Sequence, residues 1–209
     1  MRLRGLYAVT PELAGTAQLV HRVELALRGG ARLVQYRNKH ADPALRREQA
    51  AALVALCREH AARLLVNDDL ALALDTGADG VHLGREDGDL AAARAALGPQ
   101  KILGVSCYND MGLAREAGRN GADYVAFGSV FPSSTKPGAV RAPLTVLGEA
   151  GADVGLPVCA IGGITLHNAP LLIAAGADLL AVVSDLFEAP DIQARAAAYS
   201  LLFPERVTS

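Results

Sequence analysis

Cysteine is scarce in this sequence. The chain has three, Cys57, Cys107 and Cys159, an odd number without the spacing of a metal or redox motif. This pattern argues against a disulfide framework and against a cysteine metal site. We expect the three thiols to be small core side chains of a cytosolic protein, and cytoplasmic is the expected location.

The sequence also lacks an excess of charge of either sign and a long apolar run. Its formal net charge is −2, so it has no basic surface of the kind that nucleic-acid binding requires. The longest apolar run is far shorter than a membrane span, and residues 1–4 lead directly into a strand rather than into a signal peptide. We therefore expect neither nucleic acid nor a membrane as a partner.

Apolar residues are abundant instead, at 51% of 209 residues, which is enough for the core of one domain over residues 1–209. Short apolar runs alternate strictly with segments of helical periodicity. The runs predict eight strands, at residues 3–9, 32–36, 64–66, 80–83, 102–105, 124–127, 157–160 and 178–183. Eight helices are predicted after them, at 16–28, 43–60, 70–78, 89–97, from 109 or 110 to 120, about ten residues after 141, 167–175 and 190–202.

Strands that are continuous apolar runs indicate a parallel sheet that is buried on both faces. Eight strand–helix repeats are the number that closes a (β/α)8 barrel, the TIM barrel of the α/β class. A repeated tripeptide supports this fold, since Gly-Ala-Asp at 77–79, 121–123 and 176–178 each time joins a helix to the next strand. The structural alternative is an open doubly wound sheet.

Carboxylates follow two successive predicted strands. Asp68 follows the third strand and Asp87 the fourth, so the barrel would make them neighbours at the carboxyl edge of the sheet. Two carboxylates that close repel each other unless a proton or a cation lies between them. Magnesium suits such hard oxygen ligands together with substrate phosphates. The alternative is that both aspartates are helix N-caps, a position where Asp is favoured.

Three segments at the same edge suit anions. Arg37 and Lys39 lie one residue apart on an extended segment, so both side chains leave on one face, although a solvated surface pair is the alternative. Residues 133–136, Ser-Ser-Thr-Lys, combine hydroxyl donors with an ammonium, as a phosphate site does, although serine-rich loops are common. The glycine pair 162–163 and Ser184 follow the last two strands, where many barrels bind a phosphate; a tight turn is the alternative.

An acid–base couple is not evident. His82 lies at an apolar position inside a predicted strand, where we expect a hydrogen-bonded histidine of the barrel interior rather than a catalytic base. Tyr7 and Tyr36 are either core aromatics or the wall of a pocket for a ring. No Ser-His-Asp or Cys-His arrangement can be argued from the motif contexts. Two anion sites and a metal pair without a base favour ionisation of a phosphorylated leaving group over proton abstraction.

Six sequence blocks run in order along nearly the whole chain, from residue 6 to about 187. They read QYRNK at 35–39, VNDD at 66–69, HLGRED at 82–87, GVS at 104–106, FG and PSSTK between 127 and 136, and IGGI at 161–164. Together they resemble the thiamine-phosphate synthase family. That family is a (β/α)8 barrel that joins a hydroxymethylpyrimidine diphosphate to a thiazole phosphate, forming thiamine monophosphate and releasing pyrophosphate.

The resemblance implies a role for each block. One Mg²⁺ ion would be bound by Asp68 and Asp87, and the partners would be small phosphorylated substrates. The pyrimidine diphosphate would be held by Gln35, Tyr36, Arg37, Asn38, Lys39, Asn67, Ser106 and Lys136; the catalytic residues would be Arg37, Lys39, Ser106 and Lys136. The thiazole phosphate would be held by Ser133, Ser134, Thr135, Gly163, Val183 and Ser184. The reaction in the family is dissociative: pyrophosphate leaves first, and the thiazole nitrogen captures a pyrimidinylmethyl cation.

The chain departs from the family pattern at two places. Arg85 stands where the family commonly has Gln, and we expect it to alter the affinity for diphosphate rather than the reaction. Ser133 and Ser134 replace a more usual Thr-x pair. The loop of residues 128–141, the longest of the chain, is the candidate lid over the substrates.

Two rival functions remain open at this point. One is a thiazole tautomerase, which shares the barrel but performs proton transfer and needs neither diphosphate nor magnesium. The other is a non-catalytic protein that binds thiamine phosphate without turnover. The sequence leaves the oligomeric state open, a homo-oligomer included.

Overall fold

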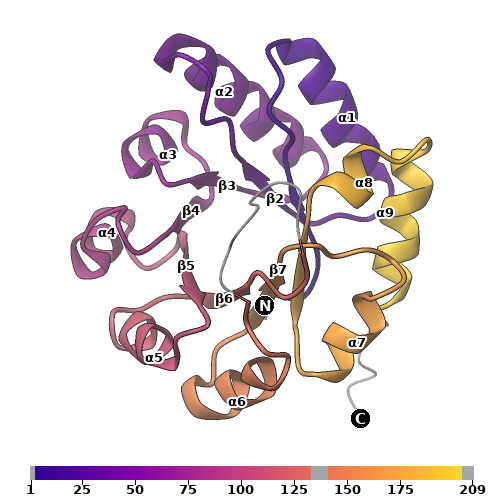
Figure 1. Cartoon of the computed structure of the whole chain (residues 1–209). Coiled ribbons are helices and arrows are strands. Elements are labelled where there is room, and N and C mark those ends of the chain that lie inside the picture. The colour runs from indigo at the N-terminus through magenta and orange to yellow at the C-terminus, as the bar shows by residue number, and fades with distance from the viewer. Residues whose placement is uncertain (1–2, 133–140, 204–209) are drawn as a thin grey trace.

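Eight parallel strands close into a barrel (Figure 1). The computed structural model describes residues 3–132 and 141–203, and in this part of the chain the strands pair in sequence order, with β8 returning to β1. The strands are β1 (Gly5–Val9), β2 (Leu33–Tyr36), β3 (Arg63–Asn67), β4 (Gly80–Leu83), β5 (Ile102–Tyr108), β6 (Tyr124–Gly128), β7 (Val158–Ile161) and β8 (Leu179–Val182). The predicted (β/α)8 barrel is confirmed, and the open sheet is excluded.

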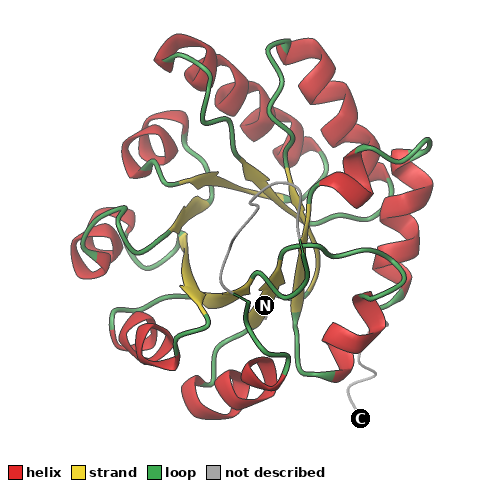
Figure 2. Cartoon of the chain, in the orientation of Figure 1, coloured by secondary structure: helices red, strands yellow, loops and turns green. Residues whose placement is uncertain are grey.

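Helices surround the barrel on its outside (Figure 2). Within the described residues they are α1 (Thr16–Arg28), α2 (Pro43–Glu59), α3 (Leu70–Thr76), α4 (Leu90–Leu97), α5 (Met111–Arg119), α6 (Thr145–Val154), α7 (Ala169–Ala174), α8 (Ser184–Phe187) and α9 (Ile192–Leu201). The sequence predicted one helix after the last strand, whereas the structure has two. The four residues of α8 are too few to show a helical period. Among these helices, none combines the length and apolar character that crossing a membrane takes.

Aspartate side chains begin five of the helices. Each accepts a hydrogen bond from a backbone N–H group two or three residues further along, at Asp42, Asp69, Asp89, Asp110 and Asp191. The predicted caps at residues 42 and 89 are therefore confirmed, and of residues 109 and 110 the structure selects 110. The cap of α3 is Asp69 rather than its neighbour Asp68.

The repeated Gly-Ala-Asp tripeptide ties each helix end to the sheet. Its glycines have φ angles of +70°, +78° and +110°, the left-handed region that favours glycine. Each aspartate accepts a hydrogen bond from an N–H near the start of the preceding strand: Asp79 from Leu64 (2.9 Å), Asp123 from Leu103 (2.8 Å) and Asp178 from Val158 (3.1 Å). The tripeptide thus fixes neighbouring strands relative to each other.

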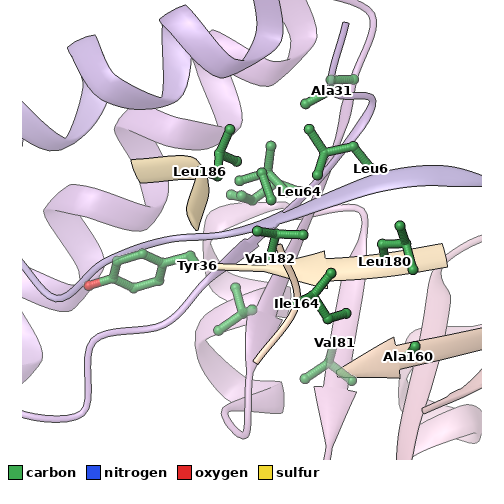
Figure 3. Close-up of a cluster of buried hydrophobic side chains, with 14 of the residues drawn as sticks. Leu6, Ala31, Tyr36, Leu64, Val81, Ala160, Ile164, Leu180, Val182 and Leu186 are labelled. Carbon is green, nitrogen blue, oxygen red and sulfur yellow. The ribbon is translucent and has the colours of Figure 1, made fainter. Parts of the chain in front are cut away.

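Apolar side chains form two layers because neighbouring residues of a strand point to opposite faces. The larger layer lies between the strands and the helices, as Figure 3 shows for Leu6, Leu64, Val81 and Leu180. The smaller fills the inside of the barrel and includes Tyr7, Leu65, Tyr124 and Leu179. The barrel is therefore a packed core whose upper layer forms the floor of any site at its mouth.

We expect Gly104→Ala to destabilise the barrel. A Cβ at this position would lie 2.1 Å from Cζ of Tyr124 and 2.2 Å from its hydroxyl oxygen, so the ring would have to move within a packed interior. The expected loss is about 1–3 kcal/mol of the free energy of unfolding, measured by urea denaturation.

Gly118→Ala in α5 is the matched control. The nearest atom to a Cβ there is Cδ1 of Leu156, at 3.8 Å, an ordinary contact. Alanine is a better helix former than glycine, so this variant should be neutral or more stable. An equal loss of stability in both variants would contradict the steric explanation for Gly104.

Candidate active site

A cavity of about 740 Å³ lies at the carboxyl ends of the strands, and all eight strand ends contribute to its wall. Of the residues predicted for the site, those that line it are Gln35, Arg37, Lys39, Asn67, Asp68, Asp87, Ser106, Gly163, Val183 and Ser184. The predicted Ser133, Ser134, Thr135 and Lys136 lie outside the described residues, as does most of the candidate lid. Apart from Tyr36 and Asn38, the described members of the predicted set thus converge on one place.

Tyr36 and Asn38 are the exceptions. The Tyr36 hydroxyl donates to Oε1 of Gln49 on α2 (2.9 Å), and its ring belongs to the layer between strands and helices (Figure 3). Asn38 donates to the same Gln49 oxygen (3.1 Å) and to the carbonyl of Leu13 (3.0 Å). Because side chains alternate along an extended segment, these two point away from the side taken by Gln35, Arg37 and Lys39. Their side chains anchor the segment to α2, and their contact with the substrate stays a prediction.

The carboxylate pair forms where β3 and β4 end. Asn67 of β3 pairs with His82 of β4, and beyond them the side chains of Asp68 and Asp87 lie close enough for each carboxyl to shift the pKa of the other. Nζ of Lys39 lies 2.8 Å from Oδ2 of Asp68. Neither aspartate caps a helix, since α3 and α4 begin at other residues' caps. The capping alternative is therefore wrong for both.

The two carboxyls have opposite pKa shifts. Burial alone would raise the pKa of Asp68, but hydrogen bonds from Lys39 and Asp87 and the charge of Lys39 hold it below the usual value. Burial and the neighbouring Asp68 carboxylate raise the pKa of Asp87, which also accepts a 2.6 Å hydrogen bond from the N–H of Gly84. Asp68 itself adopts a left-handed φ of +61°, which Asp tolerates better than most residues.

This donor set fits magnesium. Both side chains offer hard oxygen atoms that repel each other unless a proton or a cation joins them. Groups of three or more His, Cys, Asp or Glu able to hold a metal are absent from residues 3–132 and 141–203. A cation here would therefore take its other ligands from water and substrate oxygens, which is how proteins usually bind Mg²⁺.

Arg37 has a partner that the sequence did not reveal. Its Nη1 lies 2.5 Å from Oε1 of Glu12, which is on the loop after β1. The same loop is tied to the arginine backbone, because the Thr10 hydroxyl accepts from the Arg37 N–H at 2.9 Å. Glu12 and Arg37 are 25 residues apart and on different loops, so no local motif signals the pair. The ion pair holds the guanidinium at the cavity wall.

The glycine turn after β7 forms the other end of the cavity. Gly162 and Gly163 have φ angles of +100° and +63°, and a Cβ on Gly163 would lie 2.3 Å from the carbonyl oxygen of Pro132. Only glycine fits this turn. Gly163 lines the cavity together with Val183 and Ser184 at the end of β8, which is the predicted arrangement for a phosphate.

Arg195 adds a cation at this end that sequence reasoning missed. It extends from α9 to line the cavity, and its Nη1 lies 2.7 Å from Oδ1 of Asp185. The hydrogen bond to Asp185 raises the pKa of the guanidinium. The Tyr199 hydroxyl donates to the other oxygen of Asp185 at 2.7 Å. The contacts join α8 and α9, so the periodicity of a single helix gives no sign of them.

His82 is hydrogen-bonded through both ring nitrogens, as expected for an interior histidine. Nδ1 lies 2.7 Å from the Tyr124 hydroxyl and Nε2 lies 2.8 Å from Oγ of Ser106. Cys107 and Cys159 are fully buried, and the described lining of the cavity includes neither. Burial raises the pKa of the Cys107 thiol to about 12. The described site therefore contains no reactive thiol.

Arg85 is one of the two departures from the family pattern. It precedes Asp87 by two residues, but it does not line the cavity. Its guanidinium carbon is 5.4 Å from the centre of the Tyr108 ring, and its Nη2 is 3.7 Å from Oδ2 of Asp110. Among the described residues, its neighbours Gly84 and Glu86 line the cavity and Arg85 does not. An effect on diphosphate affinity stays a prediction.

Comparison with known proteins agrees with this geometry. The family model for thiamine monophosphate synthase matches residues 6–186. Curated thiamine-phosphate synthases of Aromatoleum aromaticum and Azoarcus sp. are 61% and 58% identical to the chain, over 97% of it and 97% and 98% of their own lengths. The solved thiamine phosphate pyrophosphorylase of Pyrococcus furiosus is 35% identical, with a TM-score of 0.84 over 96% of each chain. The chain belongs to the thiamine monophosphate synthase family.

Proposed function

We propose that this cavity joins a hydroxymethylpyrimidine diphosphate to a thiazole phosphate and releases pyrophosphate. The chain is a thiamine-phosphate synthase by its family model and its relatives, and the residues that serve each substrate remain to be assigned. One observation carries the assignment. The cavity has cations and paired carboxylates at the ends of β2 to β4, and a glycine turn with a serine at the ends of β7 and β8.

The side formed by β2 to β5 suits the pyrimidine diphosphate. Arg37 and Lys39 supply two positive charges, Asn67 an amide and Ser106 a hydroxyl. Hydrogen bonds between charged donors and phosphate oxygens are the stronger ones in proteins, so this set favours a highly charged anion. Gln35 lines the same side, and Lys136 joins the set by family resemblance alone.

Asp68 and Asp87 are assigned to one Mg²⁺ ion. The support is their proximity, their all-oxygen donor set and the absence of a third ligating residue from the described cluster. When bound, the ion would neutralise charge that develops on the departing pyrophosphate. Lys39, at 2.8 Å from Asp68, brings a further positive charge to the same place.

The side formed by β7 and β8 suits the thiazole phosphate. Gly163 and Ser184 line the cavity just after the ends of the last two strands, where many barrels bind a phosphate. Val183 gives this side an apolar contact for the ring. Residues 133–135 join this set by family resemblance alone.

These residues support a dissociative reaction. The bond between the pyrimidine methylene carbon and the diphosphate oxygen breaks, and the pyrophosphate takes the bonding electron pair. The thiazole nitrogen then gives its lone pair to the methylene cation, so no proton is abstracted. Arg37 and Lys39 stabilise the departing anion, which is the step that needs charge. His82 is buried and bonded at both ring nitrogens, so it is not placed to act as a base.

The two rival functions have less support. A thiazole tautomerase transfers a proton, and it would have no use for Arg37, Lys39 and the carboxylate pair together. A sensor would keep the binding groups but release no pyrophosphate, which turnover tests directly. The cytoplasm is the proposed location, where free thiols such as the three buried cysteines stay reduced.

Release of pyrophosphate on mixing the protein with both substrates is the first expected result. It should require each substrate and Mg²⁺, and EDTA should abolish it, because the departing charge then lacks its counter-ion. A coupled phosphate assay with pyrophosphatase added after removal of the protein measures the release. Folded protein that binds thiamine monophosphate without any release would favour the sensor.

Asp68→Ala should remove most of the activity and leave the barrel folded. The loss of one metal ligand is expected to lower kcat by at least about 100-fold, in the range seen for removal of one electrostatic stabiliser. Asp75→Ala is the control, since Asp75 is an exposed aspartate of α3 that pairs with Arg47 at 2.5 Å. Undiminished turnover of the Asp68 variant would end the metal-pair assignment.

Asp87→Asn should stabilise the metal-free protein. It removes the repulsion between the two carboxylates and keeps an oxygen for the Gly84 N–H. The gain should stay below about 1 kcal/mol because the pair is partly exposed to solvent, and it is measured as a rise of Tm in EDTA. Mg²⁺ should raise the Tm of the wild type but not of the variant. Equal shifts with Mg²⁺ would show that Asp87 does not bind the ion.

A further inference from the structure

Five side chains form a continuous hydrogen-bonded chain through the inside of the barrel. Nε2 of Gln35 lies 2.6 Å from the Tyr7 hydroxyl, which lies 2.9 Å from the Tyr124 hydroxyl. The Tyr124 hydroxyl is 2.7 Å from Nδ1 of His82, and Nε2 of His82 is 2.8 Å from Oγ of Ser106. The members come from β2, β1, β6, β4 and β5. We call this chain the interior relay.

The two tyrosines of the interior relay are buried, and its other members reach the cavity. Tyr7 and Tyr124 have no exposed surface, whereas Gln35, His82 and Ser106 line the cavity. The two tyrosine rings meet edge to face at 5.8 Å, and the His82 ring stacks on Tyr124 at 5.7 Å. Packing therefore prevents the two hydroxyls from turning to water, and each must find its partners within the relay.

Counting donors and acceptors gives the relay a direction. The Gln35 amide N–H donates to Tyr7, so the Tyr7 proton goes to Tyr124. Tyr124 then gives its own proton to Nδ1 of His82, and a neutral imidazole with its proton on Nε2 donates to Ser106. A charged imidazole would instead leave the Tyr124 proton without an acceptor in the relay, which is costly in a buried site.

The direction decides what the two ends offer to a ligand. Ser106 accepts from His82, so its hydroxyl proton is available to an acceptor in the cavity. Gln35 uses an N–H in the relay, so its oxygen Oε1 is available to a donor. Reversing every bond would change both ends together: Gln35 would then offer N–H groups, and Ser106 only lone pairs.

We propose that Tyr7, Tyr124 and His82 are positioning residues that set Ser106 as a donor and Gln35 as an acceptor toward the pyrimidine substrate. This role rests on the proposed function, because that substrate offers both complementary groups. Its diphosphate oxygens only accept hydrogen bonds, and the amino group of its ring donates them. The relay links the hydrogen-bonding polarity of two residues that do not touch each other.

The relay orients hydrogen bonds and carries no net charge. Burial raises the pKa of the Tyr7 hydroxyl and that of the Tyr124 hydroxyl far above the physiological range, so both stay neutral. Neither tyrosine therefore needs to exchange a proton during turnover. Their contribution is to hold one pattern of donors and acceptors before the substrate arrives.

Nitrogen NMR of the imidazole tests the direction. Protonated and unprotonated ring nitrogens have well-separated ¹⁵N signals, and His82→Gln identifies those of His82 among the five histidines. We expect the proton on Nε2 in the wild type and a mixture of tautomers in Tyr124→Phe, which has no proton to give to Nδ1. A wild-type proton on Nδ1 would overturn the direction.

A double-mutant cycle tests the coupling between Tyr124 and Ser106. Tyr124→Phe should lower kcat/KM for the pyrimidine diphosphate about tenfold, the effect of one hydrogen bond. In a Ser106→Ala background it should lower kcat/KM by a smaller factor, because only the setting of Gln35 is then left to lose. Two losses that multiply would overturn the proposal.

Tyr36→Phe is the matched control for this cycle. It removes a similarly buried hydroxyl, bonded to Gln49 at 2.9 Å and outside the relay. Whatever its size, its effect should multiply with that of Ser106→Ala. If the effects of Tyr36→Phe and Ser106→Ala on kcat/KM do not multiply, the cycle reports general damage to the barrel. That result would refute the proposal.

Two substitutions of His82 separate its two hydrogen bonds. Glutamine places an amide N–H near the position of Nε2 and keeps a donor for Ser106, whereas asparagine places its oxygen near Nδ1 and keeps only the acceptor for Tyr124. We expect His82→Gln to retain about tenfold more kcat/KM than His82→Asn. Equal losses, or the reverse order, would contradict the role of His82 in setting Ser106.

Binding measurements separate the relay from the proposed function. Wild-type protein that releases no pyrophosphate would refute the function, and the cycle is then measured as affinity for thiamine monophosphate by calorimetry. The coupling between Tyr124 and Ser106 must appear there too, or the relay is refuted as well. Circular dichroism checks folding, and Tyr7→Phe replaces Tyr124→Phe if the latter does not fold, because it breaks the relay one bond away.

Discussion

The pairing of β8 with β1 is the constraint on which the site depends. Leu180 pairs with Leu6 and Val182 with Ala8, in parallel, so the first and last strands share one ladder. All eight carboxyl ends therefore meet at one mouth. In an open sheet the glycine turn after β7 and the carboxylates after β3 and β4 would stand at separate places along the edge. Closure brings the carboxylate pair and the glycine turn into one cavity.

Alternation along the strands decides which residues enter that cavity. Gln35 and Arg37 face the mouth, and Tyr36 between them is bonded to α2. The same period separates Tyr7, inside the barrel, from Leu6, which faces the helices. A block of five consecutive residues can therefore belong to one family motif while its members have two kinds of role. Some line the cavity, and the others fix the segment that does so.

Sequence patterns predicted the features that follow from local rules. Apolar runs and turn residues predicted the eight strands, and strand order alone predicted that Asp68 and Asp87 meet. The patterns did not predict the pairing of Glu12 with Arg37 or the place of Arg195, because these depend on contacts between elements far apart in the chain. The sequence predicted the position of His82 but not its hydrogen-bond partners. Its apolar surroundings predicted an interior residue, but its partners on β5 and β6 follow only from the closed barrel.

Stability alone does not account for the polar chain inside the barrel. Phenylalanine at the positions of Tyr7 and Tyr124 would nearly preserve volume, and replacing a buried polar group together with its partner by apolar groups is often close to neutral. When every donor and acceptor in a series of side chains has a partner, the hydrogen bonds of the series can adopt a single orientation. In this barrel the chain of hydrogen bonds ends at Gln35 and Ser106, which line the cavity as His82 does, and there a ligand can use its orientation. The interior of the barrel is for that reason part of the active site as well as its support.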